Sequence, residues 1–310
     1  MIILSQGGQP ERLTAGAYLI FYTTAISIPY LMVIIYISIY VLDISTDNFI
    51  SRRSVRALLL LIPFLVKMPI FGIHFWLPKA HVEANTSGSI ILAGLLLKLG
   101  SYGAARVVLL INIVLPIPWV SSLWVILSLL AGTLTFMQRD FKKMVAYRRV
   151  THITFIIVGL VTRNKLIIAV VFLMSLAHGW AAISLFLIAG SIRHGAGSRL
   201  SNFLGSEGAL HWVIIVLGIL LVSNARVPPM PAFFSELLLL LIATVKRGAS
   251  IVMFLGVRLV VCYYNAYFFL CVRHMKPFSV INNRIKPLNG FIIVILLTLS
   301  LETLLMLVFF

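Results

Sequence analysis

IPFLVKMPIFGIHFWLPKAHVEANTSGSIILAGLLLKLG, the stretch from Ile62 to Gly100, decides the fold of this chain. Lys67 and Lys98 lie within apolar runs of the stretch, and Pro69 follows the first lysine after two residues. A charge at the centre of a bilayer costs at least about 2.5–3.5 kcal/mol, so a lysine in such a run is by default a functional residue.

Pro69 predicts a break in the helix that carries Lys67. Proline has no amide hydrogen, so the carbonyl of Leu65 loses its partner within the helix. Irregular backbone at membrane depth occurs only where it is buried in protein or lines a hydrated cavity. A lysine beside such a break therefore predicts an internal, hydrated site for cations or protons.

The composition indicates an all-α, polytopic membrane protein. Of the 310 residues, 61% are hydrophobic and 11% are charged, whereas soluble domains are about 45–50% apolar and about 25% charged. The net charge of +17 does not require nucleic acid as a partner. We assign the basic residues, including those of 139–149, to short loops, where membrane topology favours them.

A membrane-spanning helix needs about 20 apolar residues. The sequence predicts a single membrane domain over 1–310, with the end of one helix at 1–6 and then about nine spanning helices near 14–42, 57–77, 87–112, 118–138, 143–162, 164–190, 208–247, 250–272 and 289–309.

Two of these segments are predicted to be discontinuous helices, those near 57–77 and 208–247. The second is too long for one straight crossing and contains Pro228, Pro229 and Pro231. Paired proline-interrupted segments are typical of transporters built from inverted repeats. We expect the first repeat within 1–112, the second within 113–272 and a C-terminal helix within 273–310.

Lys67, Lys98 and Glu236 are the leading candidates for function, because each is flanked by apolar residues. The alternative is structural: a buried lysine paired once, or one that extends to the interface. Both lysines fall near the middle of their spans, which favours function. Burial lowers the pKa of a lysine and raises that of a carboxyl group, so a buried lysine can pass protons near neutral pH.

Four histidines and one glutamate complete the set. His152 and His178 lie inside apolar runs and are suited to shuttling protons through their two ring nitrogens, although each could simply bond a neighbouring helix. His74 and His81 are expected to be structural. Glu83 could orient the lysines or cap a helix.

Arg226 and Arg258 interrupt apolar sequence, and either could neutralise Glu236 or another carboxylate. The spacing of Cys262 and Cys271 matches no metal or redox motif, and no glycine-rich nucleotide or phosphate loop is present. We therefore expect no cofactor and no metal in this chain.

At this point the motifs resemble a known family. FLVKMPIFGIHFWLPKAHVEA and LLLKLGSYG are similar to the central signature of subunit 4 of mitochondrial NADH:ubiquinone oxidoreductase, respiratory complex I. The resemblance continues in order through QPERLTAG, THITFI, LAHGWAAISLF and VPPMPAFFSELLLL. This antiporter-like family is related to subunits of cation/proton antiporters.

The resemblance implies a mitochondrially encoded, multi-pass protein of the inner membrane that lies beside other antiporter-like subunits of complex I. It implies that NADH, flavin, iron–sulfur clusters and ubiquinone belong to other subunits. It also implies a proton relay along a hydrated axis, formed by Lys67, Lys98, His152, His178 and Glu236.

The chain departs from the family pattern in three places. Family members begin several helices earlier, with a helix whose buried glutamate partners the broken-helix lysine; Met1 falls in the tail of that helix. Residues 1–112 are therefore expected to be a remnant of the first repeat, either because the sequence is a fragment or because its lineage has lost that part. Asn85 replaces a proline, and Arg226 and Arg258 are not the usual residues.

Three functions remain open: a proton-translocating subunit of complex I, a cation/proton antiporter subunit, and a membrane-arm scaffold that has lost pumping. The matching motifs outside the lysine region favour complex I.

Overall fold

The computed structural model describes residues 10–43, 53–111, 118–161, 165–196, 211–228, 230–247 and 251–274. The regular elements within these ranges are helices, which confirms the all-α class. They are α1 (Pro10–Asp43), α2 (Arg53–Lys67), α3 (Trp76–Glu83), α4 (Thr86–Ile91), the π-helical turn η1 (Leu92–Leu96), α5 (Leu97–Ile111), α6 (Pro118–Phe136), α7 (Phe141–Val161), α8 (Lys165–Ala196), α9 (His211–Asn224), α10 (Pro231–Arg247) and α11 (Ile251–His274).

Four stretches in the described ranges are long and apolar enough to cross a membrane: Glu11–Tyr36, Thr86–Val108, Ile168–Gly190 and Phe254–Cys271. Shorter apolar helices cover Leu123–Phe136, Ile214–Asn224 and Pro231–Ile242. These spans confirm a polytopic membrane protein. The helices expected at 1–6 and 289–309 lie outside the described residues.

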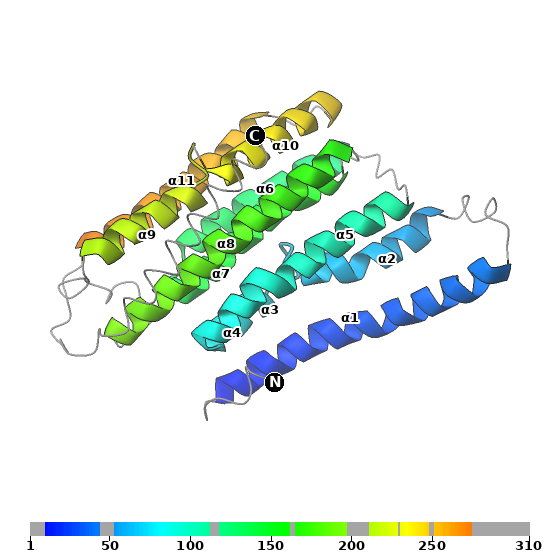
Figure 1. The fold of residues 1–310 in the computed structure, drawn as a ribbon, viewed down its shortest axis with the longest axis horizontal. Coiled ribbons are helices and arrows are strands. Elements are labelled where there is room, and N and C mark those ends of the chain that lie inside the picture. Colours follow the sequence, from blue (N-terminus) through cyan, green and yellow to red (C-terminus); the bar gives the residue numbers. More distant parts are fainter. Residues whose placement is uncertain are drawn as a thin grey trace.

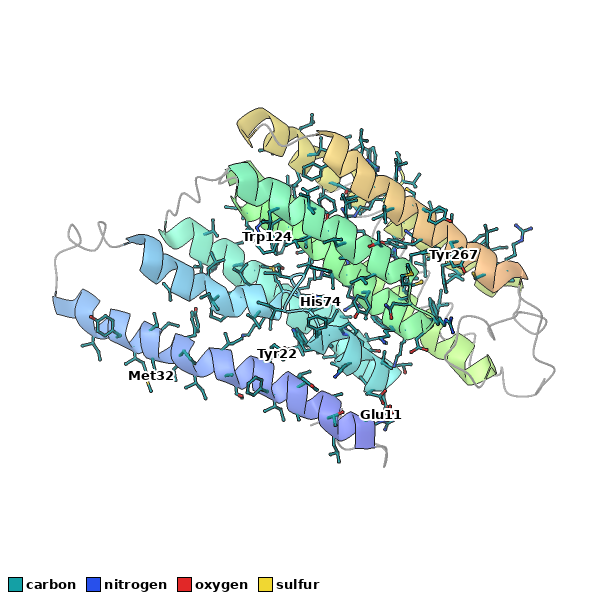
Figure 2. The ribbon with its side chains drawn as sticks, turned by 180° about the vertical axis from the view of Figure 1, so that it is seen from behind. Glu11, Tyr22, Met32, His74, Trp124 and Tyr267 are labelled. Carbon is teal, nitrogen blue, oxygen red and sulfur yellow. The ribbon has the colours of Figure 1, made fainter. Side chains whose placement is uncertain are left out.

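The helices run roughly along one common direction and lie side by side (Figure 1). α1 forms one edge, and α9, α10 and α11 lie at the opposite edge. Met32 is 64% exposed on the outer side of α1 (Figure 2). The apolar outer face of α1 is what a lipid-facing helix requires, because lipid tails are as apolar as its side chains.

α7 lies at the centre of the bundle, where it packs against α3, α5, α6, α8 and α10. Every residue from 148 to 160 is buried. The ring of Phe155 lies 5.4 Å from that of Phe254 on α11. A helix buried all round is expected to be mainly apolar, and α7 is, but it also carries the buried polar side chains Arg148, Arg149 and His152.

Both predicted helix breaks are present. α2 ends at Lys67, where the N–H of Met68 donates to the carbonyl of Phe64 at 2.9 Å. A run of turns follows, in which Gly72 has φ +104°, and α3 begins at Trp76. His74 lies within this break, near the middle of the molecule (Figure 2).

The second break separates α9 from α10, between Asn224 and Pro231. Arg226 there has a positive φ of 56°, a left-handed conformation that a residue with a side chain rarely adopts. Two further prolines, Pro29 and Pro63, lie inside α1 and α2 without ending them.

Candidate functional site

Lys98 and His178 meet in the interior of the bundle. Lys98 lies on α5, directly after the π-helical turn, and His178 lies on α8. Lys98 Nζ stands 3.2 Å from His178 Nδ1. A protonated lysine can only donate, so Nδ1 accepts this hydrogen bond. Two of the five proposed relay residues are therefore in direct contact.

His152 extends this pair from α7. Its ring centre lies 5.3 Å from that of His178. His152 is buried, and neither of its ring nitrogens has a hydrogen-bond partner in the described part of the chain. The three titratable side chains Lys98, His178 and His152 thus follow one another through the core.

A small cavity adjoins the two histidines and reaches the second helix break. Its lining includes His152, His178, Ser223, Asn224 and Arg226, and its space is about that of one water molecule. Asn224 Nδ2 is buried without a partner among the described residues. Polar groups line this cavity from both sides, as a bound water requires.

Arg226 and Glu236 form a buried ion pair across the second break. Arg226 Nη1 lies 3.0 Å from Glu236 Oε1, and the two side chains are 4% and 8% exposed. Arg258 Nη2 donates to the carbonyl oxygen of Arg226 at 2.8 Å. The sequence left open which arginine neutralises Glu236; the structure gives Arg226, with Arg258 bracing its backbone.

Two aromatic rings support these arginines. The guanidinium carbon of Arg226 lies 5.5 Å from the ring centre of Phe155 on α7. That of Arg258 lies 4.7 Å from the ring centre of Phe233 on α10. Cations stacked on rings are stabilised by about 0.5–2 kcal/mol, so both contacts strengthen the join between α7, α9, α10 and α11.

Lys67 does not lie where the sequence predicted. We expected a buried side chain at mid-span; instead Lys67 is exposed and ends α2, with Nζ 6.0 Å from the ring centre of Phe64. Within the described ranges it has no hydrogen bond or ion pair. Its neighbours Val66 and Met68 face the core, so the helical rotation turns Lys67 outward.

The structure does not bring the two lysines together, although their helices touch. A Cβ built on Gly100 of α5 would lie 3.3 Å from the Cβ of Lys67. The end of α2 therefore packs closely on α5, although the Lys67 side chain is exposed.

His81 and Arg149 form a second polar contact in the core. Arg149 Nη1 donates to His81 Nε2 at 3.2 Å. Both groups stack on Phe186 of α8, with the guanidinium carbon 4.6 Å and the imidazole centre 4.8 Å from its ring centre. This contact joins α3, α7 and α8.

The sequence grouped the basic residues of 139–149 with a loop, although the span predicted near 143–162 already included Arg148 and Arg149; the helix assignment is confirmed and the loop assignment is wrong for these two residues. α7 begins at Phe141, and Arg148 and Arg149 are almost fully buried in it. None of the three side-chain nitrogens of Arg148 has a hydrogen-bond partner in the described ranges. Its closest aromatic contact is Tyr264, 5.8 Å from the guanidinium carbon to the ring centre. Composition gave no signal for these positions, because a basic pair at a span's edge is typical of loops.

His74 holds the first break. The N–H of Gly72 donates to His74 Nδ1 at 3.1 Å, so the hydrogen of the neutral ring is on Nε2. The ring stacks between Phe71 and Phe75, at 5.0 and 4.6 Å. In the described part of the chain, no three His, Cys, Asp or Glu side chains gather closely enough to hold a metal ion.

Two solved structures share this fold. A chain of respiratory complex I from Thermus thermophilus with bound NADH superposes with a TM-score of 0.80 at 20% identity, covering 96% of this chain and 66% of that one. A chain of the Mrp complex from a Dietzia species gives a TM-score of 0.71 at 19% identity, and the match covers 88% of this chain and 52% of that one.

Curated relatives give closer matches in sequence. NADH-ubiquinone oxidoreductase chain 4 of Aedes aegypti is 36% identical over 296 residues, which cover 90% of this chain and 64% of the relative. The protein of the same name from Caenorhabditis elegans is 36% identical over 244 residues, which cover 77% of this chain and 58% of the relative. The chain therefore spans about three fifths of the length of these relatives.

The family model described as "NADH:quinone oxidoreductase/Mrp antiporter, TM" matches residues 1–262. This match covers most of the chain, including both helix breaks and the contact between Lys98 and His178. The chain belongs to the NADH:quinone oxidoreductase/Mrp antiporter transmembrane family.

Proposed function

We propose that this chain is a proton-translocating membrane-arm subunit of respiratory complex I in the mitochondrial inner membrane. One observation carries the proposal: Lys98, His178 and His152 lie in sequence through the core beside a water-sized cavity. Ionisable groups inside a membrane bundle are rare and typically form ion pathways. The names of the curated relatives support complex I as the setting.

The first step is a proton transfer between Lys98 and His178. Lys98 Nζ gives its proton to His178 Nδ1, which leaves a neutral amine and an imidazolium. The hydrogen bond of 3.2 Å provides the path, and the transfer reverses when Lys98 is reprotonated. Histidine suits this role because it accepts on one nitrogen and releases from the other.

The next step leads from His178 to His152 and the second break. At 5.3 Å between ring centres, a water in the adjoining cavity would complete the connection. Glu236 is the last group of this path, and its carboxylate is held in place by the ion pair with Arg226. Lys67 would take part from the exposed end of α2, with a carboxylate of a neighbouring subunit as its partner, because it makes no ion pair with Glu83 or any other described residue.

Partners follow from this role. We propose that this chain contacts other complex I subunits, above all neighbouring antiporter-like ones. We also propose that NADH, flavin, iron–sulfur clusters and ubiquinone are bound by other subunits of the complex. The two helix breaks suit inverted repeats within 1–112 and 113–272.

The decisive experiment compares Lys98→Ala with the parent in the assembled complex, reconstituted in vesicles. Pumped protons per electron should fall while the complex stays intact, and an unchanged ratio would refute the relay. A cation/proton antiporter subunit is the second candidate, because the Mrp complex shares the fold. Co-purification with flavin- and iron–sulfur-containing subunits would exclude it.

A further inference from the structure

Gly179 lies directly beside His178 on α8, at the point where α8 meets the side chain of Lys98. A Cβ added to Gly179 would lie 3.0 Å from Lys98 Cε and 3.8 Å from Lys98 Nζ. Carbon atoms in ordinary contact are about 3.5–4.0 Å apart. A side chain at residue 179 would therefore make a tight contact with the end of Lys98, which could relieve it only by shifting.

The chain segment that carries Lys98 is also shaped for this approach. The π-helical turn Leu92–Leu96 directly precedes α5, and π-helical turns inside α-helices frequently occur at functional sites. α4, η1 and α5 all pack against α8. Gly94 lies in this turn and Lys98 lies four residues later in α5. Both residues face α8.

Gly94 makes the matching approach from the other helix. A Cβ on Gly94 would lie 2.7 Å from Ile183 Cδ1 on α8, and the Gly94 carbonyl oxygen lies 4.0 Å from the Cβ position of Gly179. The two glycines thus allow the backbones of η1 and α8 to come close at the level of Lys98.

We propose that Gly179 is a positioning residue, which acts through Lys98 by fixing Nζ against His178 Nδ1. The proposal rests on the proton relay proposed above. Because Gly179 and His178 are adjacent on the same helix, a Cβ at 179 requires the end of Lys98 to move by a few tenths of an ångström. A shift of that size along the 3.2 Å contact with His178 Nδ1 would bring it to about 3.5 Å, the limit of a hydrogen bond.

The test is Gly179→Ala in the assembled complex, with Gly256→Ala as the matched control. Gly256 is also helical, and its added Cβ would meet only Leu129 Cδ2 at an ordinary 3.8 Å. We expect Gly179→Ala to lower pumped protons per electron by roughly two-fold or more, since the contact between Lys98 and His178 is already 3.2 Å long and a small shift breaks it. Gly256→Ala should pump like the parent.

A double variant separates positioning from general damage. If Gly179 acts through Lys98, adding Gly179→Ala to Lys98→Ala should lower pumping no further than Lys98→Ala alone. A further loss would overturn the proposal, as would parental pumping by Gly179→Ala when Lys98→Ala has lost it.

An electron cryo-microscopy map of the Gly179→Ala complex gives a readout independent of pumping. The distance from Lys98 Nζ to His178 Nδ1 should increase beyond hydrogen-bond range, and an unchanged distance would refute the positioning role. If Lys98→Ala itself pumps like the parent, the relay is wrong, while this distance still decides what Gly179 does.

Discussion

Arg226 and Glu236 are joined by an ion pair of 3.0 Å that bridges the break between α9 and α10. Both side chains are buried, and Arg226 has a positive φ of 56°, a conformation that a residue with a side chain rarely adopts. The carboxylate expected to end the relay therefore has a fixed cation beside it.

Glu236→Gln should destabilise the protein by about 3–5 kcal/mol, because it leaves a buried guanidinium without its counter-charge. Arg226→Gln combined with Glu236→Gln should recover much of this loss, since both charges are then removed. Thermal unfolding of the parent, both single variants and the double variant in lipid nanodiscs provides a double-mutant cycle. Losses of stability that simply add in the double variant would show that the two residues are not coupled.

Pumping gives a second readout for the same glutamate. Glu236→Gln should reduce protons pumped per electron more than Glu83→Gln, since the ion-pair partner of Glu236, Arg226, lines the cavity beside His152 and His178, whereas Glu83 is not among the residues that line it. Equal and unchanged ratios in the two variants would favour the scaffold reading of this chain.

Lys98→Ala and His178→Ala should each reduce pumping, and the double variant should resemble the more severe single one. The two side chains share one hydrogen bond, and residues that act as a unit are not additive. Proton-to-electron ratios in vesicles measure this. Independent losses that sum in the double variant would contradict a shared transfer step.

Lys67→Ala should reduce pumping with little effect on stability, because Lys67 is exposed and has no ion pair in the described ranges. The same ratio measurement applies, and an unchanged ratio in Lys67→Ala would show that Lys67 takes no part in pumping.

Gly72→Ala should destabilise the protein by about 1–3 kcal/mol through backbone strain. A Cβ at Gly72 would meet nothing within 4 Å, so its φ of +104° is the sole obstacle. Gly256→Ala is the opposite control: it should stabilise α11 by about 0.5–1 kcal/mol. If the thermal midpoint of Gly72→Ala rises as that of Gly256→Ala does, the first break tolerates a side chain at residue 72.

Arg148→Met should raise stability by about 1–3 kcal/mol, the usual cost of burying a polar group without a partner. The guanidinium of Arg148 has no hydrogen-bond acceptor among the described residues, so the variant removes a desolvated charge and keeps the packing volume. Arg106→Met, at an exposed position over Tyr102, is the control. A lower thermal midpoint for Arg148→Met would reveal an anionic partner.

The sequence predicted the helix breaks because proline chemistry is local. Pro69 and the prolines of 228–231 act on carbonyls a turn away, and both breaks are present. Pro29 and Pro63 show the limit of this reasoning, since each lies within a continuous helix. Whether a proline ends a helix depends on what packs around it, which no local pattern records.

The site was predicted less completely, for a geometric reason. Hydropathy places a residue along a span but does not say which side of the helix it occupies, so Lys67 was expected inside and lies outside. The contact between Lys98 and His178 joins residues 80 positions apart. Arg148 and Arg149 were counted with a basic loop although they fall in the predicted span near 143–162, and α7 carries them into the core.

The separation of Lys98 and His178 along the chain also has a consequence for biogenesis. Ribosomes add about 5–20 residues per second, so Lys98 is made roughly 4–16 s before the acceptor 80 residues later. During that interval the insertion machinery must handle a helix with an unpaired lysine. Leu95, Leu96 and Leu99 beside it each favour insertion by about 0.3–0.6 kcal/mol, which offsets part of the 2.5–3.5 kcal/mol that the lysine costs. The leucine-rich surroundings of Lys98 thus serve the nascent chain as well as the finished protein.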